Sequence, residues 1–193
     1  MNSRFAYIAA PLLVFAYGVL RIIDGLDGSR GPGFAWTAGH LAFMAALVLF
    51  AQIFWRLRAM AGRDALSTVS AVAGTVGVAT LLAQFGIDVV VGFLAADHEG
   101  MGVLFDSVQS VPGVSIVVYS GGPVLFSLGL PALMVQLAVR RRVKAWMPVL
   151  VLLDVTLPFV DKDLIPLGAL FLLISFVSLA RQAPVGRHAV AVS

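Results

Sequence analysis

The stretch VLLDVTLPFVDKDLIPLGALFLL, residues 151–173, has the composition of two apolar helices separated by a short charged segment. Only residues 161–163 separate the two apolar runs, so the helices have to form a tight antiparallel pair. Pro166 suits the first turn of the second helix, because the backbone N–H that proline lacks would be unpaired there anyway. Asp154 lies inside the first run, where a charge costs roughly 2.5 to 3.5 kcal/mol on membrane-insertion scales. The stretch therefore predicts a membrane hairpin that contains one buried acid.

The rest of the chain has the composition of a membrane protein. Of its 193 residues, 60% are hydrophobic and 12% are charged, whereas soluble domains have about 45–50% apolar and about 25% charged residues. A spanning helix needs about 20 apolar residues, which leaves room for about six spans. We predict an all-α, polytopic membrane protein without a soluble domain. The first apolar run is expected to stay as a span, since no cleavage site separates it from Arg21.

The apolar runs and loops give the expected domain organisation. Residues 1–182 are predicted to form a single transmembrane helical domain, and residues 183–193 a flexible tail. Gly121, Gly122 and Pro123 are expected to loosen the fourth helix. The polar loop at 97–113 has apolar residues at helical spacing and is either a short interfacial helix or an ordinary exposed loop. The predicted helices span about residues 5–23, 36–55, 66–95, 114–139, 145–160 and 164–180.

Charged residues predict the orientation, because Lys and Arg in short loops stay on the cytoplasmic side of a membrane. With six spans and both termini cytoplasmic, the inner side carries ten basic residues and one acid, Asp64. The outer side and outer half carry three basic residues and nine acids. The inner basic residues are Arg4, Arg56, Arg58, Arg63, Arg140, Arg141, Arg142, Lys144, Arg181 and Arg187. The outer acids are Asp24, Asp27, Asp88, Asp97, Glu99, Asp106, Asp154, Asp161 and Asp163.

Two acids inside predicted spans are the strongest candidates for chemistry, because intramembrane carboxyls usually face the bundle interior. Asp88 follows Gln84 by one helical turn, so the amide can hydrogen-bond the carboxyl. Asp154 lies near the middle of its short helix. If the two acids face each other without water, at least one of them is expected to be protonated and able to donate a proton. The alternative is that each carboxyl makes a hydrogen bond that holds helices together.

Polar side chains near the outer ends of the helices provide further candidates. Tyr17, Arg21 and Asp24 are spaced four and three residues apart, which places them on one face of the first helix. Arg21 could neutralise an acid or extend to the interface, and Asp24 could be a second acid of the pocket. His40 lies about one turn inside the outer end of the second helix, in potential reach of Asp24, and is either a functional or a structural histidine.

The remaining candidates are an outer-loop pair and several aromatic residues. The outer-loop pair is either part of the site or solvated, and the aromatic side chains either line a pocket or pack against helices and lipid. The tryptophans are expected to be interfacial anchors. The outer-loop pair is His98 and Glu99, the aromatic candidates are Tyr119, Phe85, Phe126 and Phe159, and the tryptophans are Trp36, Trp55 and Trp146.

Several kinds of chemistry lack the residues that they need. The chain has no cysteine, which excludes disulfides and thiolate catalysis. It also has no Gly-rich phosphate loop, no HExxH motif and no Asp-rich metal-diphosphate motif, so we expect no cofactor and no metal. No solvated basic patch with interleaved aromatic residues indicates nucleic acid. The expected partners are membrane lipid and a lipophilic small molecule.

Acids and aromatic rings in an apolar bundle, without metal ligands, resemble the small integral-membrane terpene cyclases of fungal meroterpenoid and bacterial indole-sesquiterpenoid pathways. The resemblance covers size and hydropathy over the whole chain, and rests on Asp24, Asp88, Asp154 and the segment DHEG at 97–100. It implies an isomerase that protonates an alkene or epoxide of a prenylated substrate, such as a farnesylated indole alkaloid, and cyclises it through a carbocation. The fungal proteins have a glutamate within a span and this chain has none, which leaves the initiating acid open between Asp154 and Asp88.

The resemblance also implies roles and a location. Asp24, His40 and Glu99 would tune the initiating acid or receive the final proton, in the cytoplasmic membrane of a bacterium. A proton-coupled transporter is the main alternative, since it would also place acids near the membrane midplane. A homo-oligomer could then supply the symmetry that the single chain lacks. The third alternative is a non-catalytic membrane subunit in which the acids only join helices.

Overall fold

The computed structural model describes residues 3–182, and this part of the chain contains helices and no strand. The all-α prediction is confirmed for these residues, whereas the predicted tail at 183–193 lies outside them. The elements in chain order are α1 (Ser3–Asp24), α2 (Phe34–Ala61), α3 (Ala65–Leu94), α4 (His98–Gln109), the π-helix η1 (Ser115–Gly121), α5 (Gly122–Val139), α6 (Trp146–Val160), the 3₁₀ turn η2 (Lys162–Leu164) and α7 (Ile165–Gln182).

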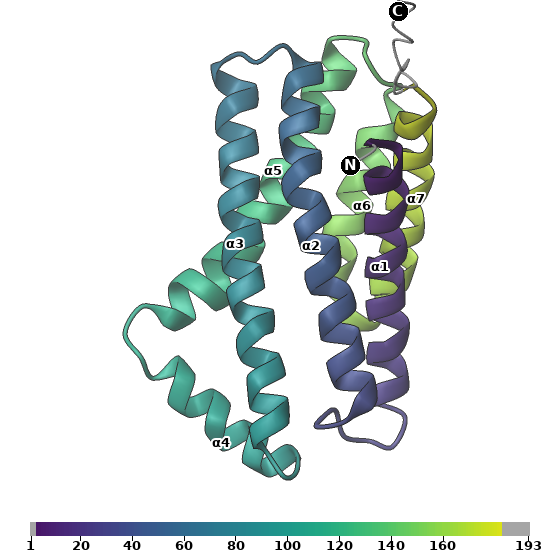
Figure 1. Cartoon of the computed structure of the whole chain (residues 1–193). Coiled ribbons are helices and arrows are strands. Elements are labelled where there is room, and N and C mark those ends of the chain that lie inside the picture. Colours follow the sequence, from purple (N-terminus) through teal and green to yellow (C-terminus); the bar gives the residue numbers. More distant parts are fainter. Residues whose placement is uncertain (1–2, 183–193) are drawn as a thin grey trace, which may run out of the picture.

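Six long helices form a closed ring (Figure 1). Helix α1 packs against α2 and α7, α3 packs against α2 and α5, and α6 packs against α5 and α7. Helix α2 also contacts α5 across the ring, which fills the interior with apolar side chains. Helix α4 lies outside the ring, near the end of α3 (Figure 1).

The surface of the ring is apolar, as a membrane requires. By length and composition, five helical segments can cross a membrane, namely those at 4–24, 34–61, 65–94, 115–139 and 162–181. Val48 of α2 and Val69 of α3 are 53% and 64% exposed, and a soluble monomer rarely leaves such large apolar patches in water. The structure is therefore compatible with a multi-pass helical membrane bundle.

The structure changes or refines the predicted helices at three places: the end of α2, the loop after α3 and the start of α5. Helix α2 continues to Ala61, past the predicted end at residue 55. The prediction followed the apolar run, whereas the helix also includes Arg56 and Arg58 in its last turns. The loop after α3 forms helix α4, capped by the Asp97 side chain, which accepts a hydrogen bond from the Gly100 N–H. The expected loosening of the fourth helix takes the form of the π-helix η1 just before α5, and π-helical turns are frequent at functional sites.

The loops separate charge between the two ends of the bundle. One end, called the basic end here, carries the α2–α3 and α5–α6 loops with Arg63, Arg140 and Lys144. The other end, called the acidic end, carries the α1–α2 and α6–α7 loops, in which Arg30 pairs with Asp163. Helix α6 runs from one end to the other, although its 15 residues cover only about 22 Å.

Glycines allow α3 and α5 to approach closely. A Cβ atom built on Gly77 would lie 2.4 Å from the backbone nitrogen of Phe126, and one on Gly129 would lie 2.8 Å from the Cα of Gly74. Backbone atoms cannot rotate away as a side chain can, so these positions require glycine. The same pair of helices is joined by a buried hydrogen bond from the Gln136 amide to the Ser70 hydroxyl. This tight contact fixes the distance between α3 and the helix that follows η1.

Helix α3 begins at an acidic cap. The Asp64 side chain accepts a 2.8 Å hydrogen bond from the Ser67 backbone N–H and also pairs with Arg140 of the α5–α6 connection. These contacts favour the ionised carboxyl, so the pKa of Asp64 is lowered from its ordinary value of 3.8, mainly by the Ser67 N–H.

We predict that Gly77→Ala destabilises the bundle by about 1 to 3 kcal/mol, because the added methyl group meets backbone atoms of α5. Gly86→Ala is the matched control, since a Cβ at Gly86 meets nothing within 4 Å. Unfolding by sodium dodecyl sulfate in detergent micelles, followed by circular dichroism, measures both variants. Equal midpoints for the two variants would contradict the close α3–α5 contact.

A second prediction concerns acid. Because the folded-state pKa of Asp64 is depressed, the carboxylate stabilises the fold above pH 3.8, and this contribution disappears as the pH falls through the lowered folded value. Asp64→Asn keeps a capping oxygen but cannot titrate, so its unfolding midpoint should fall less than that of the wild type below pH 3.8. Parallel acid titrations of the two proteins would refute the assignment, and Asp106→Asn, at an exposed acid of α4, is the control.

Candidate functional site

The candidate site is a buried carboxyl–imidazole pair near the acidic end. Asp88 of α3 and His40 of α2 are 8% and 5% exposed, and His40 Nε2 lies 3.6 Å from Asp88 Oδ2. Both residues lie on long helices, so their positions follow from helix packing rather than from a loop. The sequence predicted both residues as catalytic candidates and placed His40 within reach of Asp24, with which it lines one hollow, but it did not predict the contact between His40 and Asp88.

The hydrogen bonding of His40 determines how protons can be arranged in the pair. Its Nδ1 lies 2.7 Å from the backbone carbonyl oxygen of Trp36. A carbonyl oxygen can only accept, so Nδ1 carries a proton, and Nε2 of the neutral ring presents its lone pair to Asp88. The distance of 3.6 Å to Asp88 Oδ2 is longer than a hydrogen bond, so the carboxyl lies beside this nitrogen without bonding it. The arrangement places an acid next to a nitrogen that can accept a proton.

Trp36 joins the two helices of the pair. Its indole N–H donates a 3.1 Å hydrogen bond to the backbone carbonyl of Asp88, and its ring stacks on His40 with centroids 4.1 Å apart. Gly92 gives the indole its space, because a Cβ there would lie 2.7 Å from the indole nitrogen. Trp36 thus packs between α2 and α3 in the first turn of α2, and its role as an interfacial anchor stays a prediction. The spacing of four residues between Trp36 and His40 was the signal that could have linked them.

Aromatic rings surround the rest of the imidazole. Tyr17 lies 5.8 Å from His40 between ring centroids, and Phe85 lies 5.1 Å from it. Phe43 stacks on Phe85 at 4.5 Å. We call Tyr17, Trp36, His40, Phe43 and Phe85 the ring cluster. Its π-faces give Asp88 a weakly polar environment in which a cation can be stabilised.

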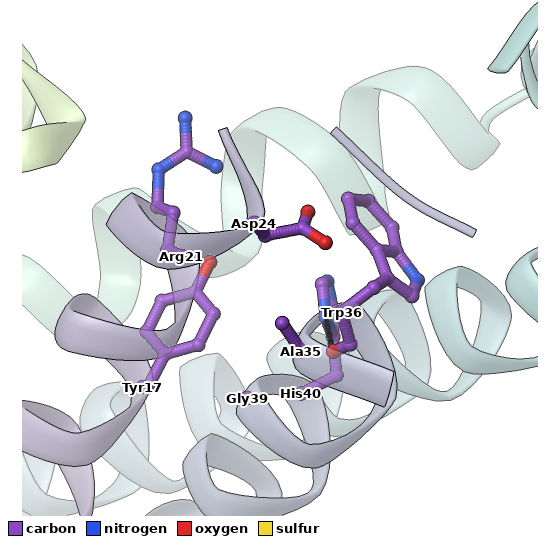
Figure 2. Close-up of a pocket in the computed structure, with 7 residues that line it drawn as sticks. All are labelled: Tyr17, Arg21, Asp24, Ala35, Trp36, Gly39 and His40. Atoms are coloured by element: carbon purple, nitrogen blue, oxygen red, sulfur yellow. Dashed lines mark hydrogen bonds between the residues drawn. The ribbon is translucent and has the colours of Figure 1, made fainter. Parts of the chain in front are cut away.

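A small hollow lies beside the ring cluster on its outer side. It has a volume of about 10 Å³ and is lined by Tyr17, Arg21, Asp24, Ala35, Trp36, Gly39 and His40 (Figure 2). That volume holds about one water molecule. Figure 2 shows the Arg21 guanidinium turned away from His40. The predicted group Tyr17, Arg21, Asp24 and His40 therefore surrounds one hollow, but this hollow is too small for a prenylated substrate.

The acidic end closes over this hollow through a network of ion pairs and hydrogen bonds. Nη2 of Arg30 lies 2.8 and 2.9 Å from the two carboxylate oxygens of Asp163, and Arg21 Nε lies 3.5 Å from the same carboxylate. Asp24 accepts a 2.9 Å hydrogen bond from the Gly31 N–H. Asp163 of the α6–α7 connection is partly exposed and pairs with two arginines from distant parts of the sequence, which the sequence did not predict.

Asp154 lies at another place in the bundle. Its carboxyl oxygen Oδ1 is 3.1 Å from where a Cβ of Gly168 would be, so the side chain lies against α7. Helices α3 and α6 are not neighbours in the ring, so Asp88 and Asp154 do not form the facing pair that we expected. Asp161, also in this hairpin, accepts a hydrogen bond from the Asp163 N–H and caps η2.

Other candidates lie outside the ring cluster. Phe126 contacts Phe50 and Phe54 deeper in the bundle, and Phe159 is 69% exposed on α6. On α4, the His98 ring contacts the carbonyl of Arg30 at 2.8 Å, while Glu99 is exposed. His98 therefore attaches α4 to the α1–α2 loop.

Gln84 and Tyr119 complete the surroundings of Asp88. Gln84 lies one turn before Asp88 on α3, and η1 packs against α3 and brings the Tyr119 hydroxyl into electrostatic contact with the Asp88 carboxyl. The Tyr119 hydroxyl is close enough to the Asp88 carboxyl to donate a hydrogen bond to it, whereas Gln84 Oε1 is buried and has no hydrogen-bond partner within residues 3–182. Within residues 3–182, no three His, Asp or Glu side chains converge in a way that could hold a metal ion.

We predict that His40 is protonated at Nδ1 at neutral pH, because that nitrogen faces the Trp36 carbonyl. Nitrogen-15 NMR of histidine-labelled protein in micelles measures the tautomer, and His40→Asn assigns the signal among the three histidines. Trp36→Phe leaves the backbone carbonyl in place and should keep the Nδ1–H form. An unprotonated Nδ1 in the wild type would contradict the proposed proton arrangement.

The chain shows no similarity to a known protein from which a function could be inferred. No family model matches the chain, and no curated protein or solved structure matches it either. A function for the site therefore has to follow from the contacts among its own side chains.

Proposed function

We propose that the chain spans a bacterial cytoplasmic membrane six times, with the basic end and both termini on the cytoplasmic side. Five long apolar segments and the shorter α6 supply the six spans. The basic loops at Arg63 and Arg140–Lys144 would stay inside, as positively charged loops do. This orientation places the Asp88–His40 pair in the outer half of the membrane.

The site is best explained as that of a metal-independent terpene cyclase that works by acid catalysis. The observation that carries the proposal is the Asp88–His40 contact, buried within the ring cluster. A buried carboxylic acid can act as a proton donor, and its apolar surroundings suit a lipophilic prenylated substrate such as a farnesylated indole.

The reaction conserves every atom of the substrate. The Asp88 carboxyl gives its proton to an alkene carbon, so an O–H bond breaks, a C–H bond forms and a carbocation remains. A second alkene or the indole ring attacks the cation and forms the new carbon–carbon bond. Loss of a proton from the cyclised cation to Asp88 or to His40 Nε2 restores the pair. The product is an isomer of the substrate, and no oxidant or reductant is needed.

The ring cluster would stabilise the cation. Tyr17 and Phe85 present π-faces beside His40, and Phe43 extends this surface along Phe85. A cation over an aromatic face gains about 0.5 to 2 kcal/mol per ring, more where water is absent. Water exclusion by the same rings would protect the cation from becoming an alcohol.

Asp88 is favoured over Asp154 as the initiating acid. Asp88 has beside it the Nε2 atom of His40, which can accept a proton after the reaction, and His40 belongs to the ring cluster. Asp154 lies against α7 near Gly168, away from that cluster. Substrate entry requires a larger space than the hollow of about 10 Å³, and we propose that η1 moves away from α3 to provide it. Ile116 and Val117 of η1 are 74% and 56% exposed, so these two side chains would face lipid.

A proton-coupled carrier is the second candidate, and the size of the hollow favours it. A space for one water beside a buried Asp–His pair suits proton transfer better than it suits a bulky ligand. In proteoliposomes under a substrate gradient, the carrier would change the pH of the lumen. The cyclase would instead form a product with the mass of the substrate, without a change of lumenal pH.

We predict that Asp88→Asn lowers cyclisation of a farnesylated indole by at least about 100-fold, because the amide cannot donate the initiating proton. His40→Gln should lower it by about tenfold or more, since the acid loses its proton partner. Membranes that contain each variant are incubated with substrate, and isomeric products are separated by chromatography and mass spectrometry.

Asp154→Asn and Asp106→Asn are the controls for this experiment, at a second intramembrane acid and at an exposed acid of α4. Both should retain cyclisation. Loss of cyclisation in Asp154→Asn together with full activity in Asp88→Asn would show that Asp154 of α6 is the initiating acid. Undiminished activity in both intramembrane variants would reject acid initiation by either residue.

A further inference from the structure

An open groove runs along the outward side of α2 near the basic end. It has a volume of about 620 Å³ and is lined by Ala51, Gln52, Trp55, Arg56 and Ala59. That volume is within the range of small-molecule sites, about 300 to 1,000 Å³. The core side of α2 is formed by other residues, among them Phe50, Phe54 and Leu57. The groove therefore opens to the surroundings of the bundle and not to its interior.

The outward side of α2 changes from apolar to polar toward the basic end. Leu41 and Val48 are exposed and lie on the same side as Gln52 and Trp55, because spacings of three, four and seven residues share one helix face. Helix α2 has 28 residues and is about 42 Å long, whereas the hydrocarbon core of a bilayer is about 30 Å thick. In a membrane, the groove would therefore extend from the hydrocarbon to the depth of the lipid headgroups, where an exposed tryptophan is common.

The charges around the groove attract an anion. Arg56 lines the groove, and the Arg58 guanidinium lies 5.3 Å from the ring centroid of Trp55. None of the described residues that line the groove is acidic, and Asp64, at the same end of the bundle, already pairs with Arg140. A guanidinium has five N–H donors, so Arg56 can bind a phosphate oxygen alongside the contacts that it makes within the protein. A phosphate group matches this charge.

Gln52 indicates that the anion belongs to a lipid. It lines the groove one turn below Arg56, about 6 Å further from the basic end. An amide that faces hydrocarbon without a hydrogen-bond partner is costly, so a polar atom is needed at this depth. The ester carbonyls of a phospholipid lie just below its phosphate, toward the acyl chains. A phosphate at Arg56 would thus bring an ester carbonyl to the Gln52 amide, which can donate a hydrogen bond to it.

We propose that this groove binds one anionic phospholipid, with the phosphate at Arg56, an ester carbonyl at Gln52 and an acyl chain along Val48. A phosphatidylglycerol headgroup adds no cation. The ammonium group of phosphatidylcholine would instead come close to Arg56 and Arg58 and be repelled. The inference goes beyond the proposed function, because it uses the location in a membrane and does not depend on the cyclisation reaction.

Native mass spectrometry of the full chain, released from detergent micelles, counts bound lipids and gives a dissociation constant for each. The two probes are phosphatidylglycerol and phosphatidylcholine with the same acyl chains. One arginine near the membrane surface favours an anionic lipid by about fivefold, so we expect phosphatidylglycerol to bind at least about fivefold more tightly. The ratio of the two constants should approach one in Arg56→Gln, which removes the charge. It should also approach one in Ala59→Phe, which fills the groove from an exposed position and keeps the charge.

Each variant has a matched control at an exposed position outside the groove. Arg142→Gln removes one charge from the α5–α6 loop of the same end, and Ala45→Phe adds a ring to the outward side of α2. Both controls should keep the preference for phosphatidylglycerol. Circular dichroism during unfolding by sodium dodecyl sulfate identifies any variant that is misfolded, so that the comparison is made among folded proteins.

Three results would overturn the proposal. The first is a ratio near one in the wild type. The second is an equal loss of preference in Arg142→Gln and Arg56→Gln, which would show that the overall charge of the basic end attracts the lipid. The third is a dimer without bound lipid, which would show that a second copy of the chain covers the groove. These measurements use no prenylated substrate, so their outcome is independent of the cyclisation test.

Discussion

The contact between Asp88 and His40 is the constraint on which the acidic end of the bundle depends. A carboxyl buried in an apolar bundle is costly, so polar groups have to lie around it. Trp36 contributes to these surroundings, because its carbonyl orients the imidazole while its indole covers it and bonds the backbone of α3. Tyr17 brings α1 to the same ring. Side chains of α1, α2 and α3 thus meet at one imidazole.

Periodicity and composition could predict the all-helical architecture and the five long apolar segments, because apolar runs of this length have few other structures. They could also locate Asp88, since a carboxyl in such a run is rare. They could not predict which helices are neighbours. In a membrane protein the lipid-facing and core-facing side chains are equally apolar, so the ring order that separates Asp154 from Asp88 leaves no trace in hydropathy.

The contacts that the sequence did not predict share a physical cause, which is packing between distant segments. The packing of α2 on α3 at Gly92 turns the Trp36 indole toward the Asp88 backbone. Asp163 and Arg30 are separated by 133 positions, and their ion pair arises from the meeting of two loops at the acidic end. Gly121, Gly122 and Pro123 did mark a change in the fourth helix, but not the π-helical form that the α3 contact imposes.

The short segment Arg30–Gly31 is held by three separate parts of the chain. The Arg30 side chain pairs with Asp163 before α7, and the Arg30 carbonyl contacts His98 of α4. The Gly31 N–H donates a hydrogen bond to Asp24 at the end of α1. Opening this loop would release all of them at once. In hydrogen exchange, the amides of the loop, of η2 and of the start of α4 would thus belong to one cooperative unit, separate from the long helices that it covers.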